Sequence, residues 1–169
     1  RSAARMTTSK SVRTIPLDAV RADGWFERLG GGSAAFAQLC LVERKFARAM
    51  LPEVRKFLFC GEALPPDTVT QLLDRFPGAE VWNTYGPTEA TIATTSIRVD
   101  REVVARYAPL PIGRPMLGSR VVILDAERRP VPDGERGEIV IAGPNVSPGY
   151  LHRPDLTEKA FFRFEGAPA

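Results

Sequence analysis

The sequence has few of the residues that bind metals or form disulfides. Its 169 residues include two cysteines and one histidine. A structural zinc site needs about four nitrogen or sulfur ligands, so this composition argues against one. Cys40 and Cys60 both lie in apolar segments without a neighbouring histidine. That setting is typical of small buried side chains in a reducing compartment.

Long apolar runs and a strong net charge are also missing. The uncharged stretch at residues 30–42 is interrupted by Ser33 and Gln38. It is shorter than the roughly 18 apolar residues that a membrane span requires. The 23 Lys and Arg nearly balance the 20 Asp and Glu, giving a net charge of +3. We therefore expect a cytoplasmic protein with no membrane span and no nucleic-acid partner.

Residues 1–32 show little pattern and are expected to form a separate N-terminal segment. Residues 1–13 are basic and rich in Ser and Thr, which superficially resembles a transit peptide. No apolar segment follows them, so secretion is not favoured. The triple glycine at residues 30–32 predicts a flexible joint.

Helix and strand patterns alternate over residues 33–99, the second predicted segment. The predicted elements are a helix from the N-cap Ser33 up to Pro52, a strand at 56–60, a helix from Pro66 to Pro77 and a strand from residue 80. Short connections between alternating elements favour an α/β fold, with a partial parallel layer and right-handed crossovers.

Residues 100–169 form the third predicted segment, which we expect to be a small, mostly β subdomain shaped as a distorted barrel. Short apolar or alternating segments predict strands at residues 120–125 and 138–142, and a further strand at residues 91–99, at the end of the second segment. Residues 132–135 (PDGE) predict a β-turn. A final helix is expected from Pro154.

A polar loop follows the strand that starts at residue 80. In an open α/β sheet, ligands bind beyond the carboxyl ends of the strands. Gly86 permits a close backbone approach, Pro87 stiffens the turn and Thr88 offers a hydroxyl to a phosphate. Glu89 offers a carboxylate oxygen to Mg²⁺, and Tyr85 a ring that can stack on a base. The same residues also suit an ordinary β-turn before a helix cap, so spacing alone leaves both interpretations open.

Two ordered motifs resemble those of a known superfamily. Residues 83–89 (NTYGPTE) resemble the nucleotide-binding signature of the adenylate-forming enzymes, which include acyl-CoA ligases, luciferases and adenylation domains of nonribosomal peptide synthetases. Residues 137–143 (GEIVIAG), continuing to Gly149-Tyr150-Leu151, look like the next motif. Residues 57–64 (FLFCGEAL) and 156–162 (LTEKAFF) are most similar to the D-alanine:D-alanyl carrier protein ligase branch.

The resemblance implies a fragment of the large lobe of an adenylation domain, with roles for individual residues. Asn83 and Tyr85 would hold the adenine, Thr88 would contact the α-phosphate and Glu89 would bind Mg²⁺. Thr84, Gly86 and Pro87 complete the ATP-binding segment, and Cys60, Thr84 and Ile92 would line the amino-acid pocket. Cys60 is equally well explained as core packing, and Glu62 as a structural or rim residue. Residues 137–150 are expected to form a hairpin without chemistry of its own.

The implied reaction is ATP- and Mg²⁺-dependent adenylation of D-alanine, or of another small amino acid. Transfer to the thiol of a D-alanyl carrier protein would follow, in the D-alanylation of lipoteichoic acid. The alternatives are part of a peptide synthetase adenylation domain, part of an acyl-CoA ligase, or a non-catalytic remnant that acts as a binding module. The superfamily's phosphate loop and C-terminal lysine are missing, and Pro148 replaces the usual Arg or Lys. We therefore expect an incomplete fragment that is inactive alone.

Overall fold

The computed structural model describes residues 2–4 and 29–163. Most of the predicted N-terminal segment, including the part of the transit-like stretch at residues 5–13, lies outside the described residues. The described residues form two compact units, which we call the α/β unit (residues 29–85 and 96–114) and the hairpin unit (residues 2–4, 86–95 and 115–163). The predicted division into three consecutive segments stays a prediction.

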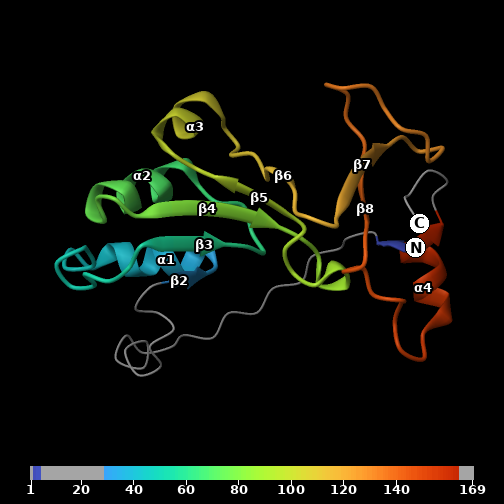
Figure 1. Cartoon of the computed structure of the whole chain (residues 1–169), viewed down its shortest axis with the longest axis horizontal. Helices are drawn as coiled ribbons and strands as arrows, with labels where there is room; N and C mark the ends of the chain where they lie inside the picture. Colours follow the sequence, from blue (N-terminus) through green and yellow to red (C-terminus); the bar gives the residue numbers. More distant parts are fainter. Residues whose placement is uncertain (1, 5–28, 164–169) are drawn as a thin grey trace. The chain divides into compact units, whose positions relative to one another are not determined.

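The α/β unit is built on parallel strands joined by helices, as the sequence predicts (Figure 1). Strand β3 pairs in parallel with β2 on one side and β4 on the other, with Leu58 opposite Gly31 and Trp82. Helices α1 and α2 connect these strands, and α2 contacts both α1 and α3. The sheet order is β2-β3-β4-β5-β6. The elements are β2 (Leu29–Gly32), α1 (Ala34–Val42), β3 (Lys56–Phe59), α2 (Pro66–Arg75), β4 (Glu80–Tyr85), β5 (Thr95–Arg98), α3 (Arg101–Arg106) and β6 (Arg114–Pro115).

The triple glycine is part of strand β2 and is not the flexible joint that its composition predicts. Its three residues pair in register with β3, from Gly30 opposite Phe57 to Gly32 opposite Phe59. Within the described residues, β2 lies at the end of the sheet order and pairs with β3. The hydrogen bonds of its backbone to β3 order the strand, and these bonds need no side chains. The glycines therefore form the edge of the sheet.

Helix α1 begins where predicted but ends early. The Ser33 hydroxyl accepts a hydrogen bond from Phe36 N at 3.2 Å, and the Glu62 carboxylate accepts one from Ala35 N at 2.7 Å. These bonds satisfy two of the amide groups left open at a helix start, which gives Glu62 a structural role. The helix ends at Val42, not near Pro52, because Glu43 is extended and its carbonyl accepts a hydrogen bond from the Arg75 guanidinium at 2.9 Å.

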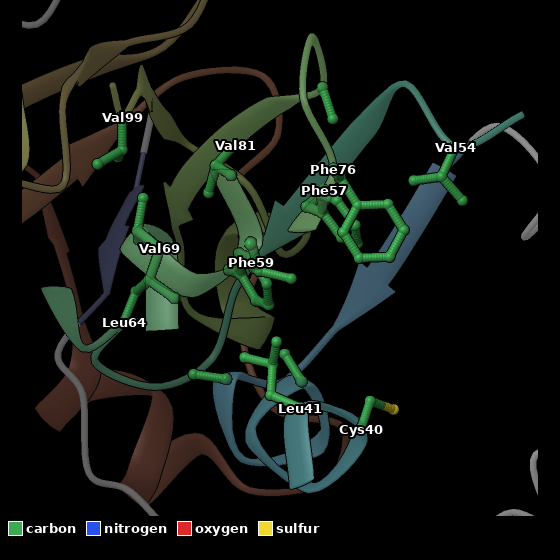
Figure 2. Packing of buried hydrophobic residues seen from close by; sticks show 14 of the residues in the cluster. Cys40, Leu41, Val54, Phe57, Phe59, Leu64, Val69, Phe76, Val81 and Val99 are labelled. Atoms are coloured by element: carbon green, nitrogen blue, oxygen red, sulfur yellow. The ribbon is translucent and has the colours of Figure 1, made fainter. Parts of the chain in front are cut away.

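Figure 2 shows the hydrophobic core of the α/β unit, where side chains of β3, α1 and α2 meet. Phe76, which is fully buried, packs edge-on against Phe46 and Phe57 with ring centroids 5.1 and 4.9 Å apart. Burial of each such side chain contributes about 1.5–3 kcal/mol of hydrophobic stabilisation. Cys40 is buried in the same core, as its apolar context predicts, and burial raises the pKa of its thiol.

Helix α3 was not predicted from the sequence, and it interrupts the expected β-rich region. The Asp100 carboxylate accepts a hydrogen bond from Val103 N at 2.9 Å and caps the helix. Six residues are too few to show a helical repeat, so the cap was the only signal available.

In its described residues, the hairpin unit contains two antiparallel strand pairs. Strands β7 (Arg120–Leu124) and β8 (Glu138–Ala142) pair with Val122 opposite Val140. The predicted turn between them is confirmed by the hydrogen bond from Glu135 N to Pro132 O at 3.2 Å, with Gly134 at a φ of 91°. The remaining elements are β1 (Ser2–Ala4), η2 (Thr88–Ala90), α4 (Pro154–Ala160), which starts as predicted, and β9 (Phe161–Arg163), which pairs with β1. Among the described residues, we find no helix with the length and apolar character to cross a membrane.

Candidate functional site

The α/β unit places three of the candidate residues at the carboxyl ends of two neighbouring parallel strands. Asn83 and Thr84 lie at the end of β4, and Cys60 directly follows β3, whose last residue Phe59 is paired with Asn83. The hydroxyl of Thr84 donates to Phe59 O at 2.8 Å, and the Asn83 amide donates to Pro111 O at 2.9 Å. Both polar side chains are buried, so these bonds fix the strand ends rigidly.

Tyr85 ends strand β4 and is half-buried. Burial raises the pKa of its phenol, so the hydroxyl stays protonated at neutral pH. Its ring is thus uncharged at neutral pH, and it directly precedes the Gly86-Pro87 bend. Cys60 is half-buried as well, and it forms no disulfide.

The hairpin unit contains the second half of the polar loop, which folds back on itself at Gly86. A β-carbon on Gly86 would lie 2.2 Å from Ile92 O and 2.8 Å from Thr94 N. The close approach that Gly86 permits is therefore that of the returning loop. Pro87 O accepts hydrogen bonds from Ala90 N at 2.9 Å and from Ile92 N at 3.3 Å, which closes a short 3₁₀ turn, η2.

Glu89 lies in this turn and is held by the segment that follows β8. The hydroxyl of Tyr150 donates to the Glu89 carboxylate, and Ser147 N donates to Glu89 O at 2.7 Å. The hydrogen bond from the hydroxyl, with burial and the carboxylate's negative charge adding to it, raises the pKa of Tyr150. Tyr150 therefore remains a donor at neutral pH. Thr88 and Ile92 are exposed, with Ile92 64% accessible.

The family model for AMP-binding enzymes matches residues 28–151, most of the chain. The chain belongs to the AMP-binding enzyme family. It is 50% identical over 135 residues to a protein named D-alanine--D-alanyl carrier protein ligase from Bacillus licheniformis and, equally, to one from Bacillus cereus. Each match covers 80% of this chain and 27% of the relative. The chain thus spans about a quarter of the length of these curated relatives.

Solved structures of adenylation domains share the fold of this family member. The Vibrio cholerae adenylation domain AlmE, solved in complex with glycyl-adenosine-5'-phosphate, is 32% identical with a TM-score of 0.72. That match covers 82% of this chain and 27% of the AlmE chain. PA1221, a nonribosomal peptide synthetase protein with adenylation and PCP domains, is 26% identical with a TM-score of 0.72. That match covers 82% of this chain and 28% of PA1221. The mixed α/β architecture is confirmed.

A magnesium ion bound by this family member would depend on few protein ligands. In the described part of the chain, no three His, Cys, Asp or Glu side chains gather closely enough to hold a metal. Mg²⁺ commonly uses one or two carboxylates together with substrate phosphates. Glu89 fits that pattern, because a carboxylate has about four acceptor positions and Tyr150 uses one of them.

Two residues of the hairpin unit contact the candidate loop without having been predicted to do so from the sequence. Tyr150 holds Glu89, and Asn145 forms hydrogen bonds with Ala90, Thr91 and Thr94. The expectation that residues 137–150 form a hairpin of their own is therefore wrong: the strand in this range, β8, pairs with β7, and the segment after β8 contacts the candidate loop. Asn145 and Tyr150 lie in or beside the second motif that resembles the superfamily, and this was the available signal. Contacts between residues more than 50 positions apart leave no periodic pattern in the sequence.

Proposed function

We propose that this chain is the nucleotide-binding portion of a ligase that adenylates D-alanine and passes it to the thiol of a carrier protein. The observation that carries the proposal is the position of the loop at residues 83–89, which starts at the carboxyl end of β4. Open α/β sheets bind ligands at that edge. The 50% identity to the D-alanine--D-alanyl carrier protein ligases supports the substrate and the reaction.

In this proposal, the loop residues divide the binding of ATP and amino acid between them. Asn83 and Tyr85 hold the adenine, while Gly86 and Pro87 fix the bend. Thr88, whose side chain is exposed, contacts the α-phosphate. Cys60 and Thr84, which lie at the strand ends of the α/β unit, line the amino-acid pocket, and the lining role of Ile92 stays a prediction.

Glu89 is the proposed magnesium ligand, and Tyr150 keeps its carboxylate in place. When bound, Mg²⁺ supplies positive charge that offsets the repulsion between the ATP phosphates and the attacking carboxylate of the amino acid. The chain's own residues orient the two anions toward each other, which is the main contribution that an enzyme makes to such a reaction. Attack on the α-phosphorus forms an acyl-adenylate and releases pyrophosphate.

A segment exchange with the Bacillus licheniformis ligase tests the proposal. The matched 135 residues of this chain replace their counterpart in that relative, and D-alanine-dependent ATP–pyrophosphate exchange is measured. We expect exchange to be retained, and to fall on the order of 10²–10³-fold with Glu89→Gln. Glu102→Gln, an exposed change on α3, is the matched control. A folded chimera without exchange would instead indicate a non-catalytic binding module.

Glycine is the second candidate substrate, because AlmE was solved with glycyl-adenosine-5'-phosphate. Exchange measured with D-alanine, L-alanine and glycine distinguishes the candidates, and a preference for larger amino acids or fatty acids would favour a peptide synthetase or an acyl-CoA ligase. The chain of 169 residues alone is expected to bind ATP weakly and to show no exchange above background. A cytoplasmic location and a part in lipoteichoic acid D-alanylation stay predictions.

A further inference from the structure

Two consecutive residues of the loop in the hairpin unit have a backbone conformation that their side chains disfavour. Thr91 has a φ of 56° and Ile92 a φ of 70°. Both are β-branched, and β-branched residues rarely occupy this left-handed region because the side chain crowds the backbone. Backbone strain of this kind persists only where the surrounding structure imposes it, and it is concentrated at functional sites.

Asn145 makes the contacts that can impose this conformation. Its amide nitrogen donates to Ala90 O at 2.8 Å, on one side of the strained pair, and to the Thr94 hydroxyl at 3.3 Å, on the other. Its backbone carbonyl accepts a hydrogen bond from the Thr91 hydroxyl at 2.8 Å. One residue, 55 positions away from Ala90 in the sequence, therefore spans both ends of the turn.

The chemistry of these contacts favours asparagine. Ala90 O only accepts hydrogen bonds, so the group that faces it must be the NH₂ end of the amide. The opposite end, the amide oxygen, accepts a hydrogen bond from the Ser119 hydroxyl at 3.2 Å, which fixes the orientation. Aspartate has the same shape but no donor and would repel the carbonyl, while alanine would leave Ala90 O without this bond.

The strained turn also displays Ile92, a large apolar side chain, with 64% of its surface accessible. Because most of the Ile92 side chain stays accessible within the described chain, its burial contributes little free energy to offset the cost of its backbone conformation. The strain is consistent with a turn shaped for a ligand.

We propose that Asn145 is a positioning residue of the nucleotide loop: it holds the strained Thr91–Ile92 turn and so fixes where Glu89 and Ile92 lie. The inference rests on the proposed function for the identity of the ligand. The effect of Asn145 on the conformation of the turn does not depend on the proposed function. The effect on the turn and the effect on ligand binding can therefore be tested separately.

The first measurement is amide hydrogen exchange in the full chain of 169 residues. The amides of Ile92 and Ala93 donate to Pro87 O and Thr91 O, bonds that exist only when the turn is formed. In Asn145→Ala and Asn145→Asp, we expect exchange at these two amides to rise at least about tenfold, with strand β3 unchanged. Ser119→Ala, which removes only the bond to the amide oxygen, is the matched control and should have a much smaller effect.

The second measurement is the binding of AMP with Mg²⁺, followed by NMR titration of the same variants. We expect Asn145→Ala to weaken AMP binding at least about tenfold. Thr91→Gly, added to Asn145→Ala, should recover part of both losses, because glycine adopts a positive φ without strain. Recovery should not be complete, since the variant also loses the hydrogen bond from the Thr91 hydroxyl to Asn145 O and leaves Ile92 strained. A residue that only stabilises the fold would not be rescued in this way.

Each outcome decides a separate point. Unchanged exchange at Ile92 and Ala93, or an equal rise throughout β3, would overturn the role of Asn145 even if AMP binds normally. Loss of protection without loss of AMP affinity would overturn it too. If the wild-type chain shows no AMP-induced shifts while the exchange results are as expected, the proposed function fails and the ligand-positioning role fails with it, while the contact of Asn145 with the turn stands.

Discussion

Replacing Gly86 by alanine tests the geometry of the loop most directly. The added β-carbon would lie 2.2 Å from Ile92 O, 2.7 Å from Ile92 C and 2.8 Å from Thr94 N. Carbon atoms in favourable contact are about 3.5–4.0 Å from their neighbours, so the two backbone segments must separate by about 1 Å. All three neighbours are backbone atoms, and no flexible side chain can move aside instead.

We expect Gly86→Ala to lower the free energy of unfolding by about 3 kcal/mol, at the upper end of the usual range for overpacking. In a chain of this size, that corresponds to a fall in Tm of about 9 °C. Urea unfolding followed by circular dichroism measures the change. Gly32→Ala is the matched control, because its added β-carbon would lie 3.6 Å from a Phe36 ring carbon, an ordinary contact. If the two variants unfold within about 0.5 kcal/mol of each other, the close approach at Gly86 is refuted.

Three further predictions concern the core, the substrate pocket and pH. Phe76→Ala should cost about 3–5 kcal/mol in urea unfolding, while the exposed Leu151→Ala should cost less than about 0.5 kcal/mol. In the segment-exchange ligase, Cys60→Ala should weaken the preference for D- over L-alanine in pyrophosphate exchange, and unchanged discrimination would leave Cys60 as core packing. The pKa of Asp125 is lowered mainly by the hydrogen bond that its carboxylate accepts from Arg129 N. The Arg129 guanidinium and a hydrogen bond from Glu127 N lower it further. Asp125→Asn should therefore destabilise the chain at pH 7, and the difference should vanish as pH falls through the lowered pKa.

The α/β layer was predictable because its signals are local. Helix α2 has Pro66 at its start and apolar residues spaced for one face, of which Val69 and Leu72 are fully buried. Strands β3 and β4 are short apolar runs with turn residues around them. A parallel sheet follows from their alternation with helices, since each connection is too short to allow many other topologies.

The errors arose where a distant contact overrides local preference. Glycine at residues 30–32 has low strand propensity, but pairing with β3 orders it. Helix α1 has apolar residues beyond Val42 at helical spacing, but the Arg75 side chain binds the Glu43 carbonyl and the chain turns there. The partners, β3 and Arg75, lie too far along the sequence to influence the local hydrophobic periodicity of the residues that they order.

In the candidate loop too, the features set by local residues were predictable, and those set by distant contacts were not. Its motif identified Gly86 and Glu89 from local chemistry, but the sequence did not show that Gly86 is approached by its own returning loop. Nor did it show that Tyr150 holds Glu89, or that Asn145 spans the strained turn. A motif specifies which groups can meet a ligand, whereas their positions depend on contacts from a segment more than 50 residues away. Asn145→Ala keeps every residue of the motif, so the weaker AMP binding expected of this variant would separate the contribution of the motif from that of the distant segment.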